Sequence, residues 1–337
     1  MGRNAFFDNA KLLLIFLVVF GHLIQPSTKD SSVLHTMYIW IYTFHMPAFI
    51  FLSGFFAKGA GNKSYIYNLA KKLLLPYLVF QALYTVFYFL IGKENWMNSV
   101  FDPQWALWFL FSLFSWHLML ILFKKIGPRY GLALAVLIGL AIGYVPEVGS
   151  LFSLSRTFVF FPFFLAGFWV RTEQLQQLKK PIIKGAGLVI MIAVALFIHW
   201  MPDLDSGWLL ASKPYSMLES PFMGVITRGL VYVTAVVMAS SVLAWIPSRH
   251  FKLTVLGART LYVYLLHGFF IQTFRKQDLF SIDNIIDATE LAIVAAVIVL
   301  VLSSKPVLKL WQPFIEGRWN SFWSFIRGNT GKRSQVS

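Results

Sequence analysis

The sequence predicts an all-α, polytopic membrane protein with about ten transmembrane helices and both termini in the cytoplasm. The first observation behind this prediction is composition. Of the 337 residues, 58% are hydrophobic and only 13% are charged, about half the charged share of a typical soluble domain. A soluble fold of this size cannot keep so much apolar side chain away from water. The composition therefore excludes a cytosolic enzyme and a disordered chain.

The second observation is a series of long apolar runs. A membrane-spanning helix needs roughly 20 predominantly apolar residues. Ten runs come close to this length, and the fifth is short and rich in glycine. The expected spans are 10–26, 37–57, 73–91, 105–123, 131–146, 155–171, 185–201, 222–246, 256–274 and 286–304. We expect one membrane domain over residues 1–310, followed by a short basic cytoplasmic tail over 311–337.

The third observation is the distribution of charge, which sums to +15. In the ten-helix arrangement the segments on the side of the termini hold 20 Lys and Arg and three acidic residues, whereas the opposite segments and adjoining helix ends hold five and eleven. Basic residues mark cytoplasmic loops, so the termini are placed inside. The pattern suits a multi-pass protein of a bacterial plasma membrane, with membrane lipid as a partner. It argues against nucleic acid as a partner, because no long basic face exists outside the apolar runs.

Several kinds of chemistry are excluded by what the sequence lacks. There is no cysteine, so disulfides, thiolate catalysis and Cys-based metal sites are ruled out. The few histidines have no acidic partners inside the spans, and no metal is expected. Neither a phosphate-binding P-loop nor a Gly-x-Ser-x-Gly serine motif occurs. The spans contain no deep carboxylate of the kind that proton-coupled pumps use.

The first span carries a polar stripe. Lys11 and His22 are eleven residues apart, which at about 100° per residue places them on one face of a helix. Asp8 and Gln25 continue the same stripe. Ionisable residues inside membrane helices are costly and usually functional, so His22, Lys11 and Asp8 are the catalytic candidates. In the alternative interpretation Asp8 only pairs with Lys11, and His22 only hydrates the outer mouth of the bundle.

Other polar residues are predicted at a similar depth. His45 precedes Pro47, which frees a backbone carbonyl in mid-helix. Tyr264 and His267 share one face of the ninth span. We expect an outer, substrate-binding cavity formed by these side chains together with two arginines: His22, His45, Tyr264, His267, Arg156 and Arg228. The alternatives are a structural role for His45 and snorkelling of the two arginines to the interface, and His117 is expected to serve only in packing.

These residues also form a family pattern. The most specific element is the basic residue ten positions before a histidine, here Lys11 and His22, with Asp8 preceding them. Further elements are Phe44-His45-Met46-Pro47, Phe51-Leu52-Ser53-Gly54, Lys72-Leu73-Leu74-Leu75-Pro76-Tyr77, Trp108-Phe109-Leu110, Phe163-Phe164-Leu165-Ala166-Gly167 and Thr260 to His267. In this order they resemble the acyltransferase-3 integral membrane proteins, in the branch similar to fucose 4-O-acetyltransferases, over roughly residues 4–310.

The resemblance implies an O-acyltransferase that takes an acyl group, in the first place acetyl, from cytoplasmic acyl-CoA as co-substrate. The acceptor would be a hydroxyl of a cell-surface or lipid-linked carbohydrate. His22 would act as base or carry the acyl group, Tyr264 or His45 would stabilise the oxyanion, and Lys71 and Lys72 would hold the CoA phosphates.

This chain departs from many relatives in two places. It has lysine at position 11 where they have arginine, and Asn68-Leu69-Ala70-Lys71 where they have Arg-x-x-Arg. Two other classes of function stay open at this point. One is a transporter or flippase for a lipid-linked sugar or anionic substrate, and the other is a sensor or assembly scaffold.

The charge pattern makes the topology testable, because the chain has no native cysteine. Cysteines introduced at Lys63 and Lys180 should be shielded from a membrane-impermeant thiol reagent in intact cells. Cysteines at Ser32 and Asp205 should react, and all four should react after the cells are opened. Labelling of the first pair in intact cells would contradict the ten-helix topology.

Overall fold

The computed structural model describes residues 4–59, 63–94, 96–148, 153–201, 204–277 and 285–317, and these residues form helices and connecting turns without a strand. The main helices are α1 (Ala5–Ile24), α2 (Ser32–Phe55), α3 (Lys63–Leu90), α4 (Trp108–Ile126), α5 (Pro128–Ala141), α6 (Leu154–Trp169), α7 (Thr172–Gln177), α8 (Pro181–His199), α9 (Gly207–Leu210), α10 (Gly224–Trp245), α11 (Thr260–Gln277), α12 (Ile285–Leu302) and α13 (Lys305–Glu316). Short 3₁₀ turns include η1 (Gln25–Lys29), η2 (Trp105–Leu107), η3 (Ile142–Tyr144), η6 (Tyr215–Leu218) and η7 (Thr254–Ala258).

The predicted all-α membrane fold is confirmed. All ten predicted apolar runs coincide with helices, namely α1 to α6, α8 and α10 to α12. In the described part of the chain, six helices are long and apolar enough to cross a membrane: those at Ala5–Lys29, Ser32–Phe55, Ser64–Leu90, Trp105–Ile126, Pro181–His199 and Gly224–Trp245. A seventh is added if α12 and α13, bent by 67°, are one span, and two shorter apolar helices cover Pro128–Tyr144 and Leu154–Trp169.

The number of ten spans and the cytoplasmic position of the termini stay predictions. The same holds for the expected domain boundary at residue 310, which falls within α13. Residues 318–337 of the expected tail lie outside the described residues.

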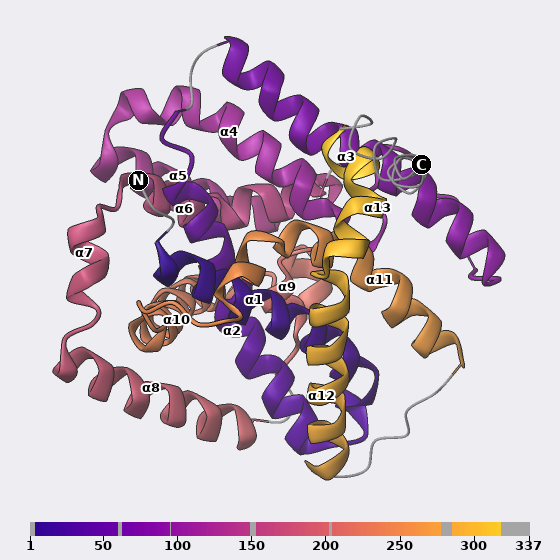
Figure 1. Cartoon of the computed structure of the whole chain (residues 1–337). Coiled ribbons are helices and arrows are strands. Elements are labelled where there is room, and N and C mark those ends of the chain that lie inside the picture. Colours follow the sequence, from indigo (N-terminus) through magenta and orange to yellow (C-terminus); the bar gives the residue numbers. More distant parts are fainter. Residues whose placement is uncertain are drawn as a thin grey trace, which may run out of the picture.

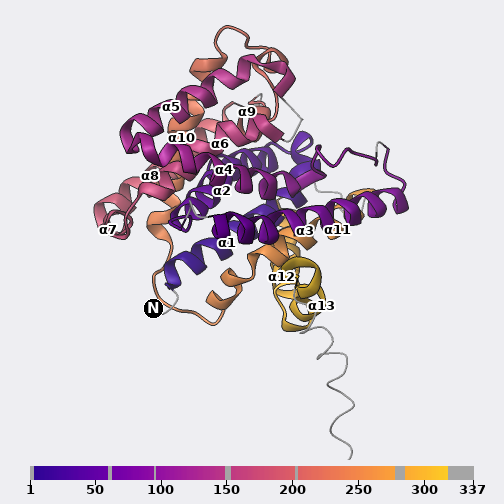
Figure 2. The ribbon, with the colours of Figure 1, turned by 90° about the horizontal axis from the view of Figure 1, so that it is seen from above.

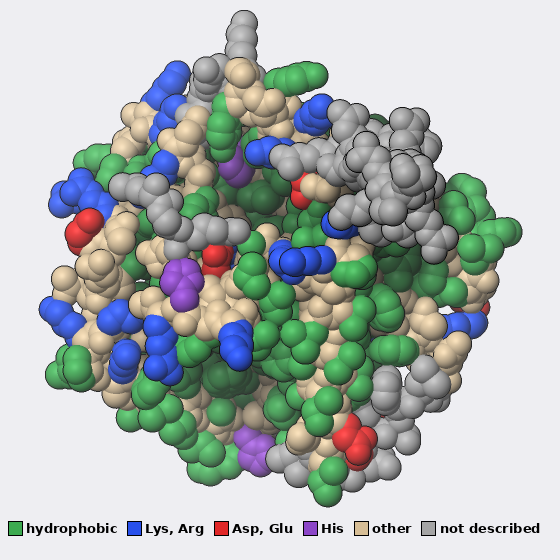
Figure 3. Space-filling view, in the orientation of Figure 1, with side chains coloured by type: hydrophobic (Ala, Val, Ile, Leu, Met, Phe, Trp, Pro, Cys, Tyr) green, Lys and Arg blue, Asp and Glu red, His purple; other side chains and the backbone are tan. Residues whose placement is uncertain are grey.

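Helices α1 and α2 form the centre of the bundle (Figures 1 and 2). On one side α1 packs against α11, α12 and η7, and on the other side α2 packs against α6, α8 and α10. Burial follows this arrangement: 67% of the apolar window of α2 is buried, against 11% of that of α8. Helix α8 therefore presents an apolar surface that only lipid can solvate. The face in Figure 3 is likewise mostly hydrophobic, with more Lys and Arg than acidic side chains.

Two glycines bring α2 and α6 into backbone contact. A Cβ atom on Gly54 would overlap the carbonyl oxygen of Phe164, and one on Gly167 would overlap the carbonyl oxygen of Phe51. The contact is thus reciprocal, each helix supplying a glycine and a carbonyl. Membrane helices use small residues in this way, because close packing replaces the hydrophobic drive that lipid removes.

The bundle has two ends, which we call the Lys11 face and the His22 face. Helices α1, α8 and α11 begin at the Lys11 face, and α2, α6, α10 and α12 end there. Three side chains join these ends: Lys58 donates to the Val170 carbonyl at 3.2 Å, Arg259 donates to Ser303 at 2.6 Å, and Asn9 donates to Pro247 at 2.9 Å.

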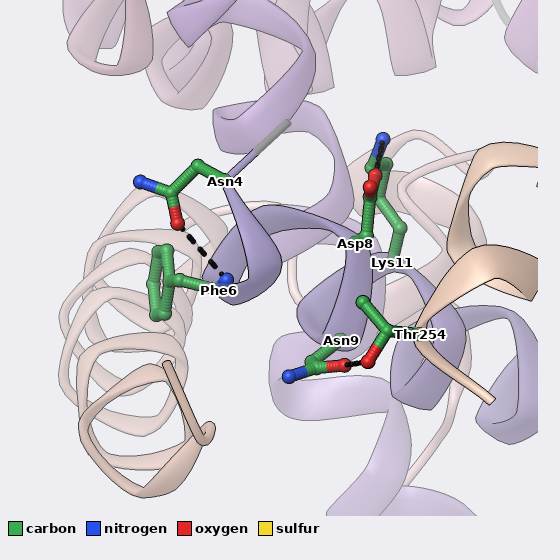
Figure 4. A network of polar contacts seen from close by, with 6 residues as sticks. All are labelled: Asn4, Phe6, Asp8, Asn9, Lys11 and Thr254. Atoms are coloured by element: carbon green, nitrogen blue, oxygen red, sulfur yellow. Dashed lines mark hydrogen bonds and ion pairs between the residues drawn. The ribbon is translucent and has the colours of Figure 1, made fainter. Parts of the chain in front are cut away.

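The start of α1 is fixed by polar contacts at the Lys11 face (Figure 4). Asn4 caps the helix by accepting from the Phe6 backbone N–H at 3.0 Å. The Thr254 hydroxyl of η7 donates to the Asn9 side chain at 2.7 Å. These bonds set both the position and the rotation of α1, and therefore the direction in which its polar stripe points.

Because α2 and α6 are in backbone contact, the stability of the protein should be sensitive to a single methyl group added at either glycine. Gly54→Ala and Gly167→Ala should each destabilise the protein by about 1–3 kcal/mol or more, because the colliding atoms are backbone and cannot move aside. Thermal denaturation of the purified protein in detergent measures the effect. Gly185→Ala in α8 is the matched control, since a Cβ there meets nothing within 4 Å. Equal stability of all three variants would contradict the contact.

Candidate functional site

An elongated cavity of about 380 Å³ lies between α1, α2, α4, α6 and α11, with Leu73 of α3 in its wall. Along α1 its wall runs from Ile15 to Gln25, a rise of about 15 Å at 1.5 Å per residue. Along α2 it runs from Tyr42 to Ser53. The cavity therefore extends along the helix axes, from near the Lys11 face to the His22 face, through about half the thickness of a hydrocarbon core.

The polar stripe of α1 lies along this cavity. His22 and Gln25 are in its wall, with Ile15 and Val18 between them and the Lys11 face. Lys11 lies one turn before Ile15 and is outside the wall, where its Nζ forms an ion pair with Asp8 at 2.9 Å. The pairing considered as an alternative is thus present. It holds the lysine beside the end of the cavity, and His22 lies about 16 Å of helical rise away.

His22 is held by several neighbours at the opposite end of the cavity. Its Nδ1 lies 3.4 Å from the Tyr42 hydroxyl. The Trp105 ring is 4.6 Å away between centroids, and the His267 ring 5.6 Å. Arg275 donates from one terminal nitrogen to the His22 carbonyl and to the Gln25 side chain, both at 2.8 Å. The guanidinium thereby closes the last turn of α1, whose carbonyls have no partner within the helix.

His45 and Tyr264 also line the cavity, but their hydrogen atoms are already engaged. The His45 Nδ1 lies 2.9 Å from the carbonyl oxygen of Ile41, so this nitrogen carries the proton and the neutral ring offers Nε2 as an acceptor. The Tyr264 hydroxyl donates to the carbonyl oxygen of Ala106. The resemblance implies that one of these residues stabilises an oxyanion, which requires a free hydrogen-bond donor. In this arrangement Tyr264 has none, and His45 has one only when its ring is protonated.

His267 lies behind the cavity wall. It is fully buried, its Nδ1 lies 2.7 Å from the Tyr264 carbonyl oxygen, and its Nε2 has no hydrogen-bond partner among the described residues. It supports His22 from the side rather than lining the cavity. His117 bonds to the Leu113 carbonyl at 2.8 Å and packs on Phe164, which suits the packing role expected for it.

The structure places the two arginines in different surroundings. Arg156, in the first turn of α6, lines the cavity at the His22 face. Arg228 is not in the cavity wall, contrary to expectation. It is 2% exposed, donates to the Trp208 carbonyl, and stacks on the Trp208 and Tyr215 rings. Because α10 places it beneath the segment that contains α9 and η6, it anchors that segment instead.

Lys71 and Lys72 are exposed on α3 and are likewise outside the cavity wall. They immediately precede Leu73, which does line the cavity. Their position is therefore at the rim of its Lys11 end, and their expected role in phosphate binding stays a prediction. Among the described residues no group of three His, Asp or Glu side chains could hold a metal ion.

Sequence reasoning missed Trp105 and Tyr42. Trp105 has a positive φ of 45°, which is a genuine outlier for a bulky residue. Its indole packs against both His22 and His267, and Gly268 leaves room for it because any Cβ there would overlap the ring. A tryptophan at the expected start of a span indicates only an interfacial anchor. Only the fold of the loop before α4 brings it to the site.

A family model described as an acyltransferase domain, acyltransferase 3, matches residues 4–304. Nodulation protein NolL of Sinorhizobium fredii is 26% identical over 336 residues, covering 92% of this chain and 88% of the relative. NolL of Mesorhizobium japonicum is 26% identical over 316 residues, covering 85% and 81%. No solved structure matches. Since the family model covers nearly the whole chain, this protein belongs to the acyltransferase-3 family and is a membrane acyltransferase.

Proposed function

We propose that the protein is an O-acyltransferase that moves an acyl group, most simply acetyl, from acyl-CoA to a hydroxyl of a cell-surface or lipid-linked carbohydrate. The observation that carries the proposal is the elongated cavity that runs from near the Lys11 face to His22. Donor and acceptor enter from opposite ends and meet at His22. The Lys11 face is then cytoplasmic, as the basic loops predict, in the plasma membrane of a bacterium like its two relatives.

The donor end suits a long, thin and mostly apolar arm. Ile15, Ser53 and Leu73 line this part of the cavity, and none of the described Lys, Arg, Asp or Glu residues does so. The pantetheine arm of acyl-CoA would lie here, with its phosphates outside the cavity. Lys71 and Lys72 are at this rim, and Lys11 is one turn before Ile15. Lysine holds a phosphate as a point charge rather than as a fork, which suits a binding site at an exposed rim.

Chemistry at His22 follows from its position. An imidazole ring can accept a proton on one nitrogen and give it back, as a general base requires. It would take the proton of the acceptor hydroxyl while the oxygen attacks the thioester carbonyl carbon, and then return that proton to the departing CoA thiolate. Alternatively, its ring nitrogen attacks first and carries the acyl group briefly. In either route Tyr42 and Arg275 hold the ring and its helical turn in place.

The proposal predicts a large loss of activity from one substitution. His22→Gln keeps hydrogen bonding but cannot take a proton. It should leave a folded, membrane-inserted protein whose acyl transfer falls by roughly 10²–10⁴-fold. The measurement is transfer of label from acetyl-CoA to carbohydrate acceptors by the purified protein. His117→Ala, which alters only packing, is the control and should be nearly silent. Normal turnover by His22→Gln would remove proton transfer and acyl carriage from the role of His22.

The same assay separates the rival function. A flippase for a lipid-linked sugar would move its substrate in reconstituted vesicles without labelling it and without binding acetyl-CoA. An acetyl adduct on His22 after exposure to acetyl-CoA alone would favour the covalent route, and its absence during normal turnover would favour direct transfer.

The orientation of His22 gives a second, smaller prediction. Tyr42→Phe removes the hydroxyl that lies 3.4 Å from Nδ1 and keeps the ring. Acetyl transfer should fall by about fivefold, the equivalent of about 1 kcal/mol, which is the usual net value of one hydrogen bond. Tyr67→Phe is the matched control because Tyr67 is 71% exposed on α3. An unchanged rate in Tyr42→Phe would show that this hydroxyl does not orient His22.

A further inference from the structure

One charged side chain stands out in the cavity wall. Of the lining residues in the described part of the chain, Arg156 is the only Lys, Arg, Asp or Glu. The rest of the wall is apolar or aromatic apart from two histidines and a few neutral polar groups. A half-buried guanidinium in such surroundings has lost part of its hydration, a cost that proteins normally offset with an anionic partner.

Arg156 has no such partner within the described residues. Its Nε donates to the carbonyl oxygen of Leu210 at 3.2 Å, and its guanidinium lies 5.0 Å from the Trp108 ring centroid. Its two terminal nitrogens form no ion pair and no further hydrogen bond with the residues that the structure describes. Leu210 and Trp108 thus fix the plane of the guanidinium and leave its outer edge free. That edge is the fork that binds carboxylate or phosphate through two parallel hydrogen bonds.

The position of Arg156 indicates which of the two proposed substrates, the donor or the acceptor, carries the anionic group that it binds. It belongs to the first turn of α6, at the His22 face, next to Leu209 and Leu210 of α9. The donor phosphates belong at the opposite rim, beyond Ile15 and Leu73. Since the cavity wall extends about 15 Å along α1, one donor molecule with its thioester at His22 keeps its phosphates far from Arg156. The free edge of Arg156 therefore lies at the end of the cavity where the proposed acceptor enters.

We propose that Arg156 binds an anionic group of the acceptor, so that the substrate class is an acidic carbohydrate carrying a carboxylate or phosphate near the acylated hydroxyl. This inference rests on the proposed function, because it takes the acceptor to enter at the His22 face. Trp108 and Trp105 would lie beside the sugar ring, and His22 would face the hydroxyl.

Among the described residues, the carboxylate that interacts with Arg156 is that of Asp102, and it does not take this place. Asp102, in the loop before η2, is close enough to interact electrostatically with Arg156 but forms no ion pair with it. Burial raises the pKa of Asp102, and the charge of Arg156 acts in the opposite direction.

Binding and transfer can be measured separately with matched probes. The first probe is a glucuronate-containing oligosaccharide, the second is its carboxyl-reduced neutral form, and the third is the neutral form carrying a phosphate ester. Binding to the full-length protein is followed by tryptophan fluorescence without donor, and transfer by label from acetyl-CoA. We expect at least one acidic probe to bind at least tenfold more tightly than the neutral one. The better acidic probe identifies the carboxylate or the phosphate.

Substitutions then assign the preference to Arg156. Arg156→Gln should weaken binding of the preferred acidic probe at least tenfold and leave binding of the neutral probe and of acetyl-CoA unchanged. Arg156→Lys keeps the charge and loses the two parallel donors. Its affinity for the preferred acidic probe should lie between that of the unsubstituted protein and that of Arg156→Gln. Its remaining preference for that probe shows that the loss in Arg156→Gln is not a folding defect. Lys213→Gln is the control for long-range charge, because Lys213 is exposed on the same face and pairs with Asp205 outside the cavity. It should keep the acidic preference.

The outcomes separate this inference from the proposed function. Equal binding of all three probes by the unsubstituted protein would overturn the inference, even if acetyl transfer occurs. An equal loss of transfer to acidic and neutral probes in Arg156→Gln would also overturn it, and would place Arg156 at the reacting acyl group. Tight, Arg156-dependent binding of an acidic probe without acetyl-CoA binding would support the inference and reject the proposed donor.

Discussion

The backbone contact between α2 and α6 is the constraint on which the site depends. Gly54 and Gly167 let each helix approach the other's carbonyl oxygen. This contact lies near the Lys11 face, where both helices end. The same two helices also line the cavity, through Phe49 on α2 and Phe160 on α6. The glycines thus fix how closely α2 and α6 approach, and therefore how these two walls of the cavity lie relative to each other.

The second requirement is a rigid α1. This helix is tied at its start by Asn9 and Thr254 and at its end by Arg275. Both ties come from the segment around α11, so α1 is joined to that segment near both of its ends. Side chains that share the wall between them keep their spacing as a result. A site meant to transfer a group between two molecules needs such preorganisation, because small displacements of the reacting groups lower the rate steeply.

Two features of the site could not be read from residue order. Arg156 and Arg228 are both arginines expected at one depth, yet one faces the cavity and the other anchors α9. Their difference comes from the rotation of α6 and α10 within the bundle, which depends on tertiary packing. The sequence pattern places Trp105 at the start of a span, whereas its position beside His22 depends on a positive φ and on space left by Gly268. A periodic pattern contains neither kind of information.

The sequence by itself determined the class of the protein, its helices and the stripe that contains His22. Composition and apolar run length are properties of consecutive residues, and the periodicity of a single helix fixes which side chains share its face. The spacing of Lys11 and His22 therefore places them on one face of α1 without knowledge of any neighbouring helix. Only the tertiary structure decided which side chains from other helices complete the site. Contacts between helices such as Tyr42 with His22, or Arg275 with the end of α1, depend on relative rotation and crossing of helices, which packing alone sets.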